Sequence, residues 1–356
     1  MKLKRVLGAV ALSLSLITLT ACGGAERSAS GDDSKVYELN LNVSAAPTSP
    51  FTQQAANPWA EYVEEQTDGK IKVNVFPSAG LGSLSTAWED ISAGLYEGGF
   101  APPGLHVDTE LFPMTIADIP FLITSPETAQ KVLAKFSDKY MKDVFVDSTL
   151  VGVSSTDAYQ IYSTSPIKTV KDLKNFKISD TVTARIDLFK ELGSVPVSLS
   201  NTELYESLER GVVEAVAYTA VGANGYKFDE VAPYMTKIDM AVSTLPIFIN
   251  TNFLNSLTED LRKQFMDDLG PKYAELITEL YTTQAEEGVN IFEGNVKDQG
   301  GSVYVPTEEE LAEFKAPVKK QMEAWVKEAD KRGYKGQEMM DYFVELLEAE
   351  GIEAPK

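Results

Sequence analysis

The sequence predicts an α/β fold built of two lobes, because strand-like and helix-like segments alternate along a chain of 356 residues. Residues 37–43 (YELNLNV) alternate apolar and polar side chains as a strand does, and 70–76 (KIKVNVF) do so again before Pro77. Residues 57–67 and 84–94 have helical spacing, and 98–101 begin another buried strand. This β-α-β-α-β order is typical of a parallel sheet flanked by helices.

A second set of alternating segments begins near residue 150 and predicts a second α/β unit. Its expected strands and helices are 177–178, 186–192, 195–199, 203–210 and 212–217. Residues 257–292 then form one long helical pattern, interrupted at Gly270 and Pro271, and residues from 307 to the end are amphipathic and helical.

The N-terminus predicts export. Lys2, Lys4 and Arg5 precede an almost wholly apolar run, residues 6–19, which is too short for a stable membrane-spanning helix. Leu19-Thr20-Ala21-Cys22 resembles the lipobox of bacterial lipoproteins, which implies that residues 1–21 are a signal peptide and that Cys22 becomes an acylated first residue. The alternative is a plain secretory signal that contains a cysteine. Either interpretation places the chain outside the cytoplasm, and the first places it on a membrane.

Residues 22–35 are mostly small and polar and predict a flexible leash. Removal of the signal leaves 335 residues, which is enough for two lobes, and no cysteine follows Cys22, so the fold contains no disulfide. The net charge of −21 becomes −24 without the three basic residues of the signal. Such acidity argues against nucleic acid and against an anionic membrane surface as partners.

Catalytic and metal-binding signatures are scarce. His106 is the only histidine, which argues against histidine-paired metal sites and against a serine triad. The chain has no phosphate-cradling glycine-rich loop, no GxSxG elbow and no Cys-x-x-Cys. We therefore expect a binding protein without a cofactor or metal, and not an enzyme. A secreted hydrolase is a distant alternative, which would require turnover dependent on His106.

Several segments agree, in order and spacing, with one family. They are KIKVNVFPSAGLG at 70–82, DIPFL at 118–122, SPI at 165–167, VKDLKNFKI at 170–178 and LGSVPVSLSNTELYESLERGVVEA at 192–215. Together they resemble the DctP-type solute-binding proteins of TRAP (tripartite ATP-independent periplasmic) transporters. The resemblance implies a monomeric receptor that closes two lobes on a small solute and delivers it to a TRAP permease driven by an ion gradient.

The resemblance also implies a periplasmic-binding-protein-like fold with mixed sheets, crossing segments and a long lobe-spanning helix. Lobe one is expected at 36–156 plus 243–284, lobe two at 157–242, and a C-terminal segment with helices packing across both lobes at 285–356. The long helix would bend as the lobes close, with Gly270 and Pro271 as a hinge.

The sequence departs from the family at its polar anchors. Many members clamp a substrate carboxylate with an arginine, because a guanidinium binds a carboxylate in a bidentate manner. Ser179 stands at that position here, Tyr159 stands at a second arginine position, and Tyr218 stands at an asparagine position. Asp157 and Asp180 adjoin Tyr159 and Ser179. Tyrosine rings with neighbouring carboxylates favour a small amine or a neutral polar solute over a dicarboxylate.

Further residues complete the expected ligand site. They are Ser44, Phe100, Asn201 and Phe248. Phe100 and Phe248 would extend an aromatic wall, although ordinary core packing explains both equally well.

Arg185 leaves an acid-binding alternative open. It lies six residues after Ser179 at the start of a helix, and from there it could hold the carboxylate of a monocarboxylate ligand. The competing interpretation is a surface arginine paired with Asp187 or Asp180. An orphan sensory binding protein is a further alternative to a permease-linked receptor.

Overall fold

A computed structural model describes residues 35–354 of the chain. The predicted signal peptide, Cys22 and nearly all of the expected leash lie outside these residues. Within the described range, no helix combines the length and the apolar character that crossing a bilayer requires.

The first sheet has the strand order β2-β1-β3-β10-β4. Its strands are β1 (Tyr37–Asn42), β2 (Ile71–Phe76), β3 (Gly98–Phe100), β4 (Ser148–Ser155) and β10 (Thr244–Asn250). β1 runs parallel to β2 and β3, as the sequence pattern predicts, whereas β10 is antiparallel to both β3 and β4. The helices that follow these early strands are α1 (Asn57–Gln66), α2 (Ala87–Ala93) and α3 (Pro126–Tyr140).

The second sheet has the order β11-β9-β5-β8-β6-β7. Its strands are β5 (Tyr159–Ser163), β6 (Lys177–Ser179), β7 (Val195–Val197), β8 (Ala215–Thr219), β9 (Tyr234–Thr236) and β11 (Ser302–Tyr304). It carries α4 (Thr183–Glu191), α5 (Leu204–Glu209) and α6 (Ala220–Gly225). β6 is parallel to β7 and β8, and β5 is antiparallel to β8 and β9, so both sheets are mixed. The predicted two-lobed α/β fold is confirmed.

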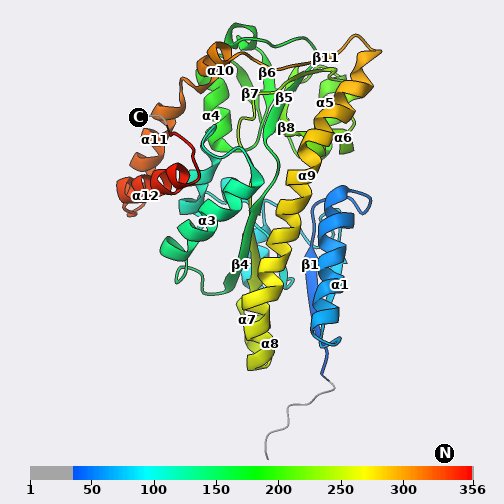
Figure 1. The fold of residues 1–356 in the computed structure, drawn as a ribbon, viewed down its shortest axis with the longest axis vertical. Helices are drawn as coiled ribbons and strands as arrows, with labels where there is room; N and C mark the ends of the chain where they lie inside the picture. The colour runs from blue at the N-terminus through cyan, green and yellow to red at the C-terminus, as the bar shows by residue number, and fades with distance from the viewer. Residues whose placement is uncertain (1–34, 355–356) are drawn as a thin grey trace, which may run out of the picture. The chain divides into compact units, whose positions relative to one another are not determined.

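One long helix, α9 (Gly270–Lys297), runs beside both sheets (Figure 1). In the first lobe, the hydroxyl oxygens of Ser154 and Thr278 lie 2.8 Å apart. In the second lobe, the Asn224 amide donates to the carbonyl of Gly288 at 2.8 Å. The helix therefore passes from one lobe to the other between residues 278 and 288.

The expected interruption at Gly270 and Pro271 takes a specific form. α7 (Thr251–Ser256) and α8 (Glu259–Gln264) come first, and a π-helical turn, Phe265–Leu269, joins α8 to α9. Pro271 has no N–H to donate and crowds the preceding turn, and the wider turn relieves both conflicts. A Cβ on Gly270 would lie 2.6 Å from Cβ of Val151, so only glycine fits here. Val151 is in β4 of the first sheet, so this contact ties the start of α9 to lobe one. Residues 270 and 271 are therefore not favoured as the hinge between the lobes.

The C-terminal helices are α10 (Glu308–Lys315), α11 (Val318–Lys331) and α12 (Gly336–Ala349). α12 packs on α3, where the rings of Phe136 and Phe343 meet edge to face at 5.8 Å. α11 reaches both lobes. Its Trp325 indole donates to the Thr115 hydroxyl at 2.9 Å, and its Lys320 pairs with Glu191 of α4 at 3.1 Å. The division of the chain into lobe one, lobe two and a C-terminal segment stays a prediction.

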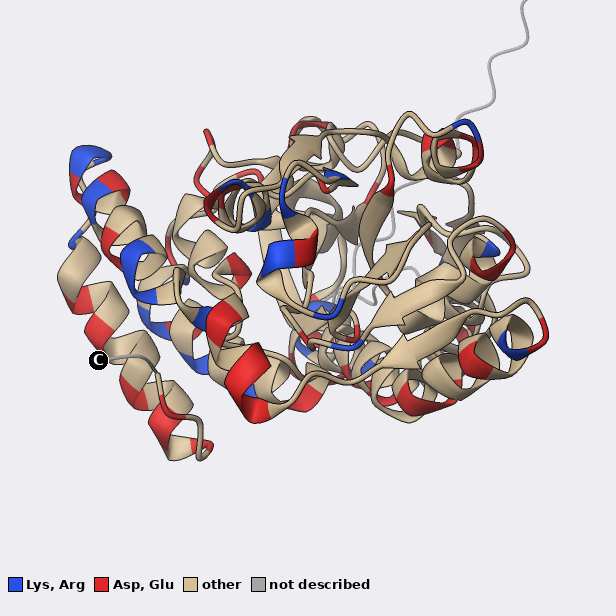
Figure 2. Cartoon of the chain, turned by 90° about the horizontal axis from the view of Figure 1, so that it is seen from above, with Lys and Arg blue, Asp and Glu red and all other residues tan. Residues whose placement is uncertain are grey.

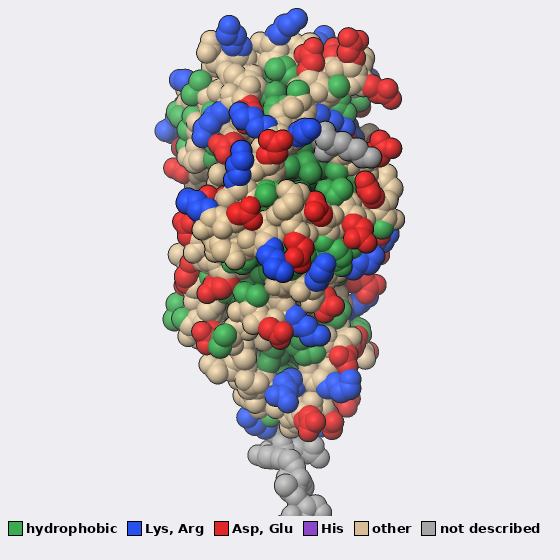
Figure 3. All heavy atoms as spheres, turned by 90° about the vertical axis from the view of Figure 1, so that its left-hand side faces the viewer, with side chains coloured by type: hydrophobic (Ala, Val, Ile, Leu, Met, Phe, Trp, Pro, Cys, Tyr) green, Lys and Arg blue, Asp and Glu red, His purple; other side chains and the backbone are tan. Residues whose placement is uncertain are grey.

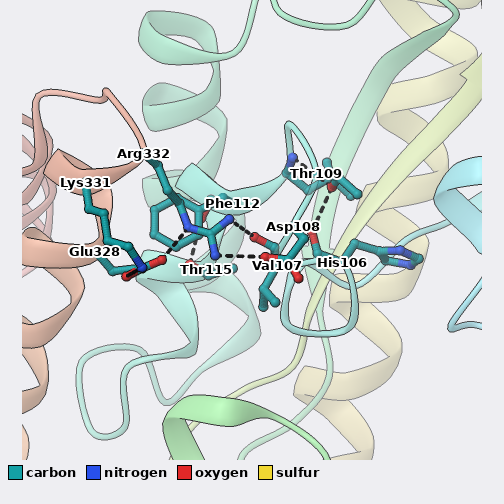
Figure 4. A network of polar contacts seen from close by, with 10 residues as sticks. His106, Val107, Asp108, Thr109, Phe112, Thr115, Glu328, Lys331 and Arg332 are labelled. Carbon is teal, nitrogen blue, oxygen red and sulfur yellow. Dashed lines mark hydrogen bonds and ion pairs between the residues drawn. The ribbon is translucent and has the colours of Figure 1, made fainter.

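Arg332, just after α11, fixes this helix to the loop that begins at His106 (Figure 4). Its guanidinium donates to the Val107 carbonyl at 2.7 Å, to Asp108 at 2.9 Å and to Glu328 at 2.8 Å. It also lies over the Phe112 ring, with Cζ 4.5 Å from the centroid. Arg332 thus ties this loop to the end of α11.

Charged residues of both signs are interspersed along the helices and loops (Figure 2), and their side chains are mixed over the face shown in Figure 3. Several of these charges form exposed pairs one helical turn apart, as in Arg210 with Glu206 and Lys335 with Glu338. Such exposed pairs contribute little to stability individually. The informative charges are those buried between the lobes.

Candidate functional site

The candidate site is centred on a buried ion pair at the start of α4. Asp180 follows β6, and its Oδ1 accepts the backbone N–H groups of Thr181 and Val182 at 2.7 and 2.9 Å. This local turn leads the chain into α4 and brings Arg185 back, so that its Nε donates to Asp180 Oδ2 at 2.7 Å. Both side chains are only 1% exposed. The Asp180 carboxylate is therefore fully engaged by donors, and the pair is close to neutral.

Arg185 is also covered by an aromatic ring. Its Cζ lies 4.0 Å from the centroid of Tyr159, which is half-buried on β5. Burial works to lower the pKa of Arg185, but the charges of Asp180 and Asp118 and the Tyr159 phenol outweigh it and hold the pKa above its usual value. The Nη1 atom is buried and has no hydrogen-bond partner among residues 35–354. Arg185 does pair with Asp180, as one interpretation expected, but it is a buried arginine and not a surface one.

An aromatic series connects the two lobes at this place. The ring centroids of Tyr159 and Tyr218 are 5.9 Å apart, and those of Tyr218 and Tyr226 are 5.5 Å apart at 90°. Tyr281 of α9 has its pKa raised by burial first and then by Asp157, Tyr159, Tyr273 and Tyr226. Two predicted site residues, Tyr159 and Tyr218, are thus neighbours.

Lobe one contributes its own rings to the series. The centroid of Phe51 is 6.3 Å from that of Tyr281 and 5.5 Å from that of Phe100. Phe100 is thereby joined to the series, although it is 5% exposed and also belongs to the core under the first sheet.

Asp157 occupies the N-terminal end of α6. Its Oδ2 accepts the backbone N–H groups of Ala220 and Val221 at 2.7 and 3.3 Å, and the residue is 1% exposed. Burial raises its pKa to about 7, against the lowering effect of those N–H groups. Oδ1 has no partner within the described part of the chain.

Asp118 is a candidate that the sequence interpretation missed. It ends the 3-10 helix η3 (Phe112–Asp118), is 2% exposed, and its Oδ2 lacks a hydrogen-bond partner in the described range. Burial raises its pKa to about 7, Arg185 lowers it, and Asp180 raises it. A lone carboxylate inside the apolar run from Thr115 to Phe121 was the available signal, since such a group is rarely buried without a use.

The remaining predicted residues are dispersed. Ser179 is buried at the end of β6, and its Oγ has no partner among the described residues. Ser44 is partly exposed just after β1, and Asn201 is exposed at the start of the 3-10 helix η5 (Asn201–Glu203). Phe248 is fully buried, with the rings of Trp88 and Phe145 each 5.0 Å away, which supports its alternative interpretation as core packing.

His106 is engaged in local structure. Its ring is buried, with Nε2 2.9 Å from the Leu84 carbonyl and Nδ1 3.5 Å from Glu89. Burial lowers its pKa, so the ring is neutral at physiological pH. Among residues 35–354, no group of three or more histidine, cysteine or carboxylate side chains is arranged to hold a metal ion.

Comparison with known proteins identifies what this arrangement resembles. Residues 41–329 match the family DctP, described as bacterial extracellular solute-binding protein, family 7. The chain is 25% identical over 323 residues to the outer membrane transporter protein TsaT of Comamonas testosteroni, covering 86% of this chain and 90% of that protein. It is 29% identical over 219 residues to the C4-dicarboxylate-binding protein DctB of Bacillus subtilis, covering 59% and 61%.

Solved structures share the fold. A TRAP solute-binding protein from Rhodoferax ferrireducens, in complex with copurified benzoate, superposes with a TM-score of 0.81 at 19% identity, covering 88% of this chain and 98% of that one. One from Bordetella bronchiseptica, with bound (R)- and (S)-mandelate, gives a TM-score of 0.78 at 20% identity, with coverage of 88% and 99%.

Proposed function

The chain belongs to the DctP family of TRAP solute-binding proteins, and on that premise we propose that its ligand is a small monocarboxylate held by Arg185. The observation that carries this proposal is the buried guanidinium, whose Nε is engaged by Asp180 while Nη1 has no partner among residues 35–354. A ligand carboxylate supplies the missing acceptor. A hydrogen bond between two such charged groups is among the stronger ones that proteins make.

The surroundings of Arg185 favour a ligand with an apolar or aromatic body. Tyr159 covers one face of the guanidinium, and Tyr218, Tyr226 and Tyr281 continue the aromatic surface. Two relatives in fold contain benzoate and mandelate, both monocarboxylates with a ring. An aromatic monocarboxylate fits these two features together, with the acid on Arg185 and the ring against tyrosine.

A small amine or neutral polar solute is the second candidate. It was the first expectation from the sequence, because serine and tyrosine replace the anchors of the family. The unpartnered oxygens of Asp118 and Asp157 are the observation in its favour. It ranks second because the buried Nη1 of Arg185, which has no acceptor among residues 35–354, is a donor that an acid satisfies and an amine does not.

The family role implies capture outside the cytoplasm and delivery to a TRAP permease, with no chemical step on the solute. Attachment to the membrane through Cys22, a monomeric state and a permease in place of a sensor kinase as the receiver are parts of the same proposal. Labelling with a radioactive fatty acid, and its loss in Cys22→Ser, would test the anchor.

The ligand is tested by titration calorimetry and thermal unfolding with benzoate, phenethylamine and a polyol. A ligand at a hundred times its Kd stabilises the protein by about 2.7 kcal/mol. We expect benzoate to bind and the double variant Arg185→Met/Asp180→Asn, which removes both charges together, to lose that binding. Arg210→Met is the matched control, because Arg210 is exposed just after α5 and pairs with Glu206. Binding of phenethylamine alone would overturn the proposal.

A further inference from the structure

We propose that Asp118 is a second recognition residue, which selects acids that carry a hydroxyl or ammonium group over the same acids without one. The inference rests on the proposed function, since it concerns a ligand whose carboxylate is bound by Arg185. The two residues come from opposite lobes. The ligand would thus be recognised at its acid end by α4 and at a neighbouring donor group by η3.

Asp118 lies close to the start of α4, with Gly104 between them. A Cβ placed on Gly104 would lie 2.8 Å from Asp118 Oδ2 and 3.0 Å from Val182 Cγ1. Gly104 belongs to the 3-10 helix η2 (Pro103–Leu105) in lobe one, and Val182 immediately precedes α4 in lobe two. The unpartnered carboxylate oxygen and the residue that precedes α4 therefore both lie against Gly104, where the two lobes meet.

The segment that carries Asp118 is fixed from behind. Thr115, one turn earlier in η3, accepts the Trp325 indole N–H at 2.9 Å, and Arg332 binds the carbonyl of Val107 in the same loop (Figure 4). A side chain held by a rigid segment is pre-organised, so it adds selectivity at a low entropic cost on binding.

The two aspartates near Arg185 differ in their partners. Asp180 has two backbone N–H groups and the Arg185 Nε, whereas Asp118 Oδ2 has none among the described residues. A buried carboxylate without a donor is costly, and the cost disappears when a donor reaches it. A hydroxyl or ammonium group on the ligand is such a donor, and it is the group that the protein itself does not supply.

The charge balance leads to the same ligand class. Arg185 contributes one positive charge, Asp180 cancels it, and an ionised Asp118 leaves the group at −1. A plain carboxylate would bring this to −2 in a buried place, whereas an amino acid adds no net charge and a hydroxy acid adds a donor that offsets part of the repulsion. The favoured ligands are therefore α-amino and α-hydroxy monocarboxylates.

Two matched series test this. They are phenylacetate, mandelate and phenylglycine, and propionate, lactate and alanine, each measured by calorimetry at pH 7.5. We expect the hydroxy or amino acid of at least one series to bind ten-fold or more tightly than its plain acid. Asp118→Leu should reduce this preference to less than three-fold while the plain acid binds equally or more tightly. Asp118→Asn should lose the ammonium preference and keep part of the hydroxyl preference, since its amide oxygen still accepts a hydrogen bond.

The exposed Asp143→Asn on lobe one is the charge-matched control and should leave every ratio unchanged. Circular dichroism and thermal unfolding show whether each variant is folded. Equal binding of all three acids of both series to the natural protein, or a preference that survives in folded Asp118→Leu, overturns the role of Asp118 and leaves the Arg185 proposal intact. Failure of every acid to bind overturns both.

Discussion

The guanidinium of Arg185 lies over the Tyr159 ring, with its Cζ 4.0 Å from the ring centroid. Its Nε donates to Asp180 Oδ2 at 2.7 Å. In the proposed function Tyr159 is a positioning residue for Arg185, and the ligand carboxylate binds the unpartnered Nη1. Cation–π contacts of this kind contribute about 0.5–2 kcal/mol.

Tyr159→Leu is therefore expected to weaken acid binding about 2- to 30-fold, which is that contribution converted to a ratio of Kd values. Tyr159→Phe keeps the ring and should change Kd by less than about two-fold. Tyr205→Leu, which removes a surface tyrosine bonded to Glu230, serves as the control. Calorimetric Kd values decide the matter, and equal losses in the leucine and phenylalanine variants would assign the effect to the hydroxyl instead.

The burial of Asp118 predicts a stability that depends on pH. Its pKa is about 7 in the folded protein against an ordinary 3.8. Below pH 4 the carboxyl is protonated in both states. Between pH 4 and 7 the unfolded chain ionises first, so the folded protein loses stability as pH rises, by at most about 1.4 kcal/mol per pH unit. Above about pH 7 the loss is complete.

Asp118→Asn does not titrate, so its stability relative to the natural protein should increase from pH 4 to 7 and then level off. Urea unfolding at half-unit steps of pH measures this difference. Arg185 and Asp180 also act on Asp118. Both residues are present in the two proteins, so their own contributions to stability cancel in the comparison. A difference that is constant across this range would contradict the buried, raised-pKa description of Asp118.

The contacts around Gly104 indicate how closely the two lobes must approach each other when they close on a ligand. An alanine there would place Cβ 2.8 Å from Asp118 Oδ2 and 3.0 and 3.1 Å from the two methyl groups of Val182. Because these neighbours belong to both lobes, we expect Gly104→Ala to hold them apart and to weaken ligand binding at least ten-fold. Small-angle scattering with ligand should show a larger radius of gyration than in the natural protein.

Room can be restored from the other side of the same contact. The double variant Gly104→Ala/Val182→Ala removes the methyl groups of Val182 and should recover part of the affinity. If Gly104→Ala binds as tightly as the natural protein, the contact between η2 and Val182 is not required for closure.

The sequence alone predicted those parts of the fold that depend on the local pattern of apolar and polar residues. The alternation in 37–43 and 70–76 and the buried segment at 98–101 predict β1, β2 and β3 and their parallel pairing. It did not predict β10, which enters the first sheet antiparallel between β3 and β4 from a segment far along the chain. That pairing depends on tertiary contacts, for which the fully buried and mostly apolar β10 carries no distinguishing periodicity.

The site was predictable only in part for a related reason. Tyr159 and Tyr218 were predicted from their anchor positions, and they are neighbours in space. The burial of Arg185 was not predicted, because the turn made by Asp180 that directs it inward depends on side-chain hydrogen bonds that spacing does not reveal. The proximity of Asp118 to Arg185 was not predicted, because it arises between lobes and not along the chain.

α9 contains two glycines that differ in their contact with α6. Alanine substitutions at these two positions therefore compare a packed site with an open one in the same helix. A Cβ on Gly288 would lie 3.0 Å from the carbonyl carbon of Ala220, whereas a Cβ on Gly294 would have nothing within 4 Å. Replacement of either glycine by alanine gains about 0.5–1 kcal/mol of helix propensity. Gly294→Ala should therefore stabilise the protein by about that amount in urea unfolding.

Gly288→Ala should instead destabilise it, because the added methyl group displaces the first residue of α6. That residue also donates its N–H to Asp157 at 2.7 Å, so the displacement reaches the candidate site. We expect a higher Kd, and so weaker ligand binding, in Gly288→Ala and an unchanged Kd in Gly294→Ala. Similar stability and affinity in the two variants would mean that α6 yields freely, and that α9 does not fix the position of Asp157.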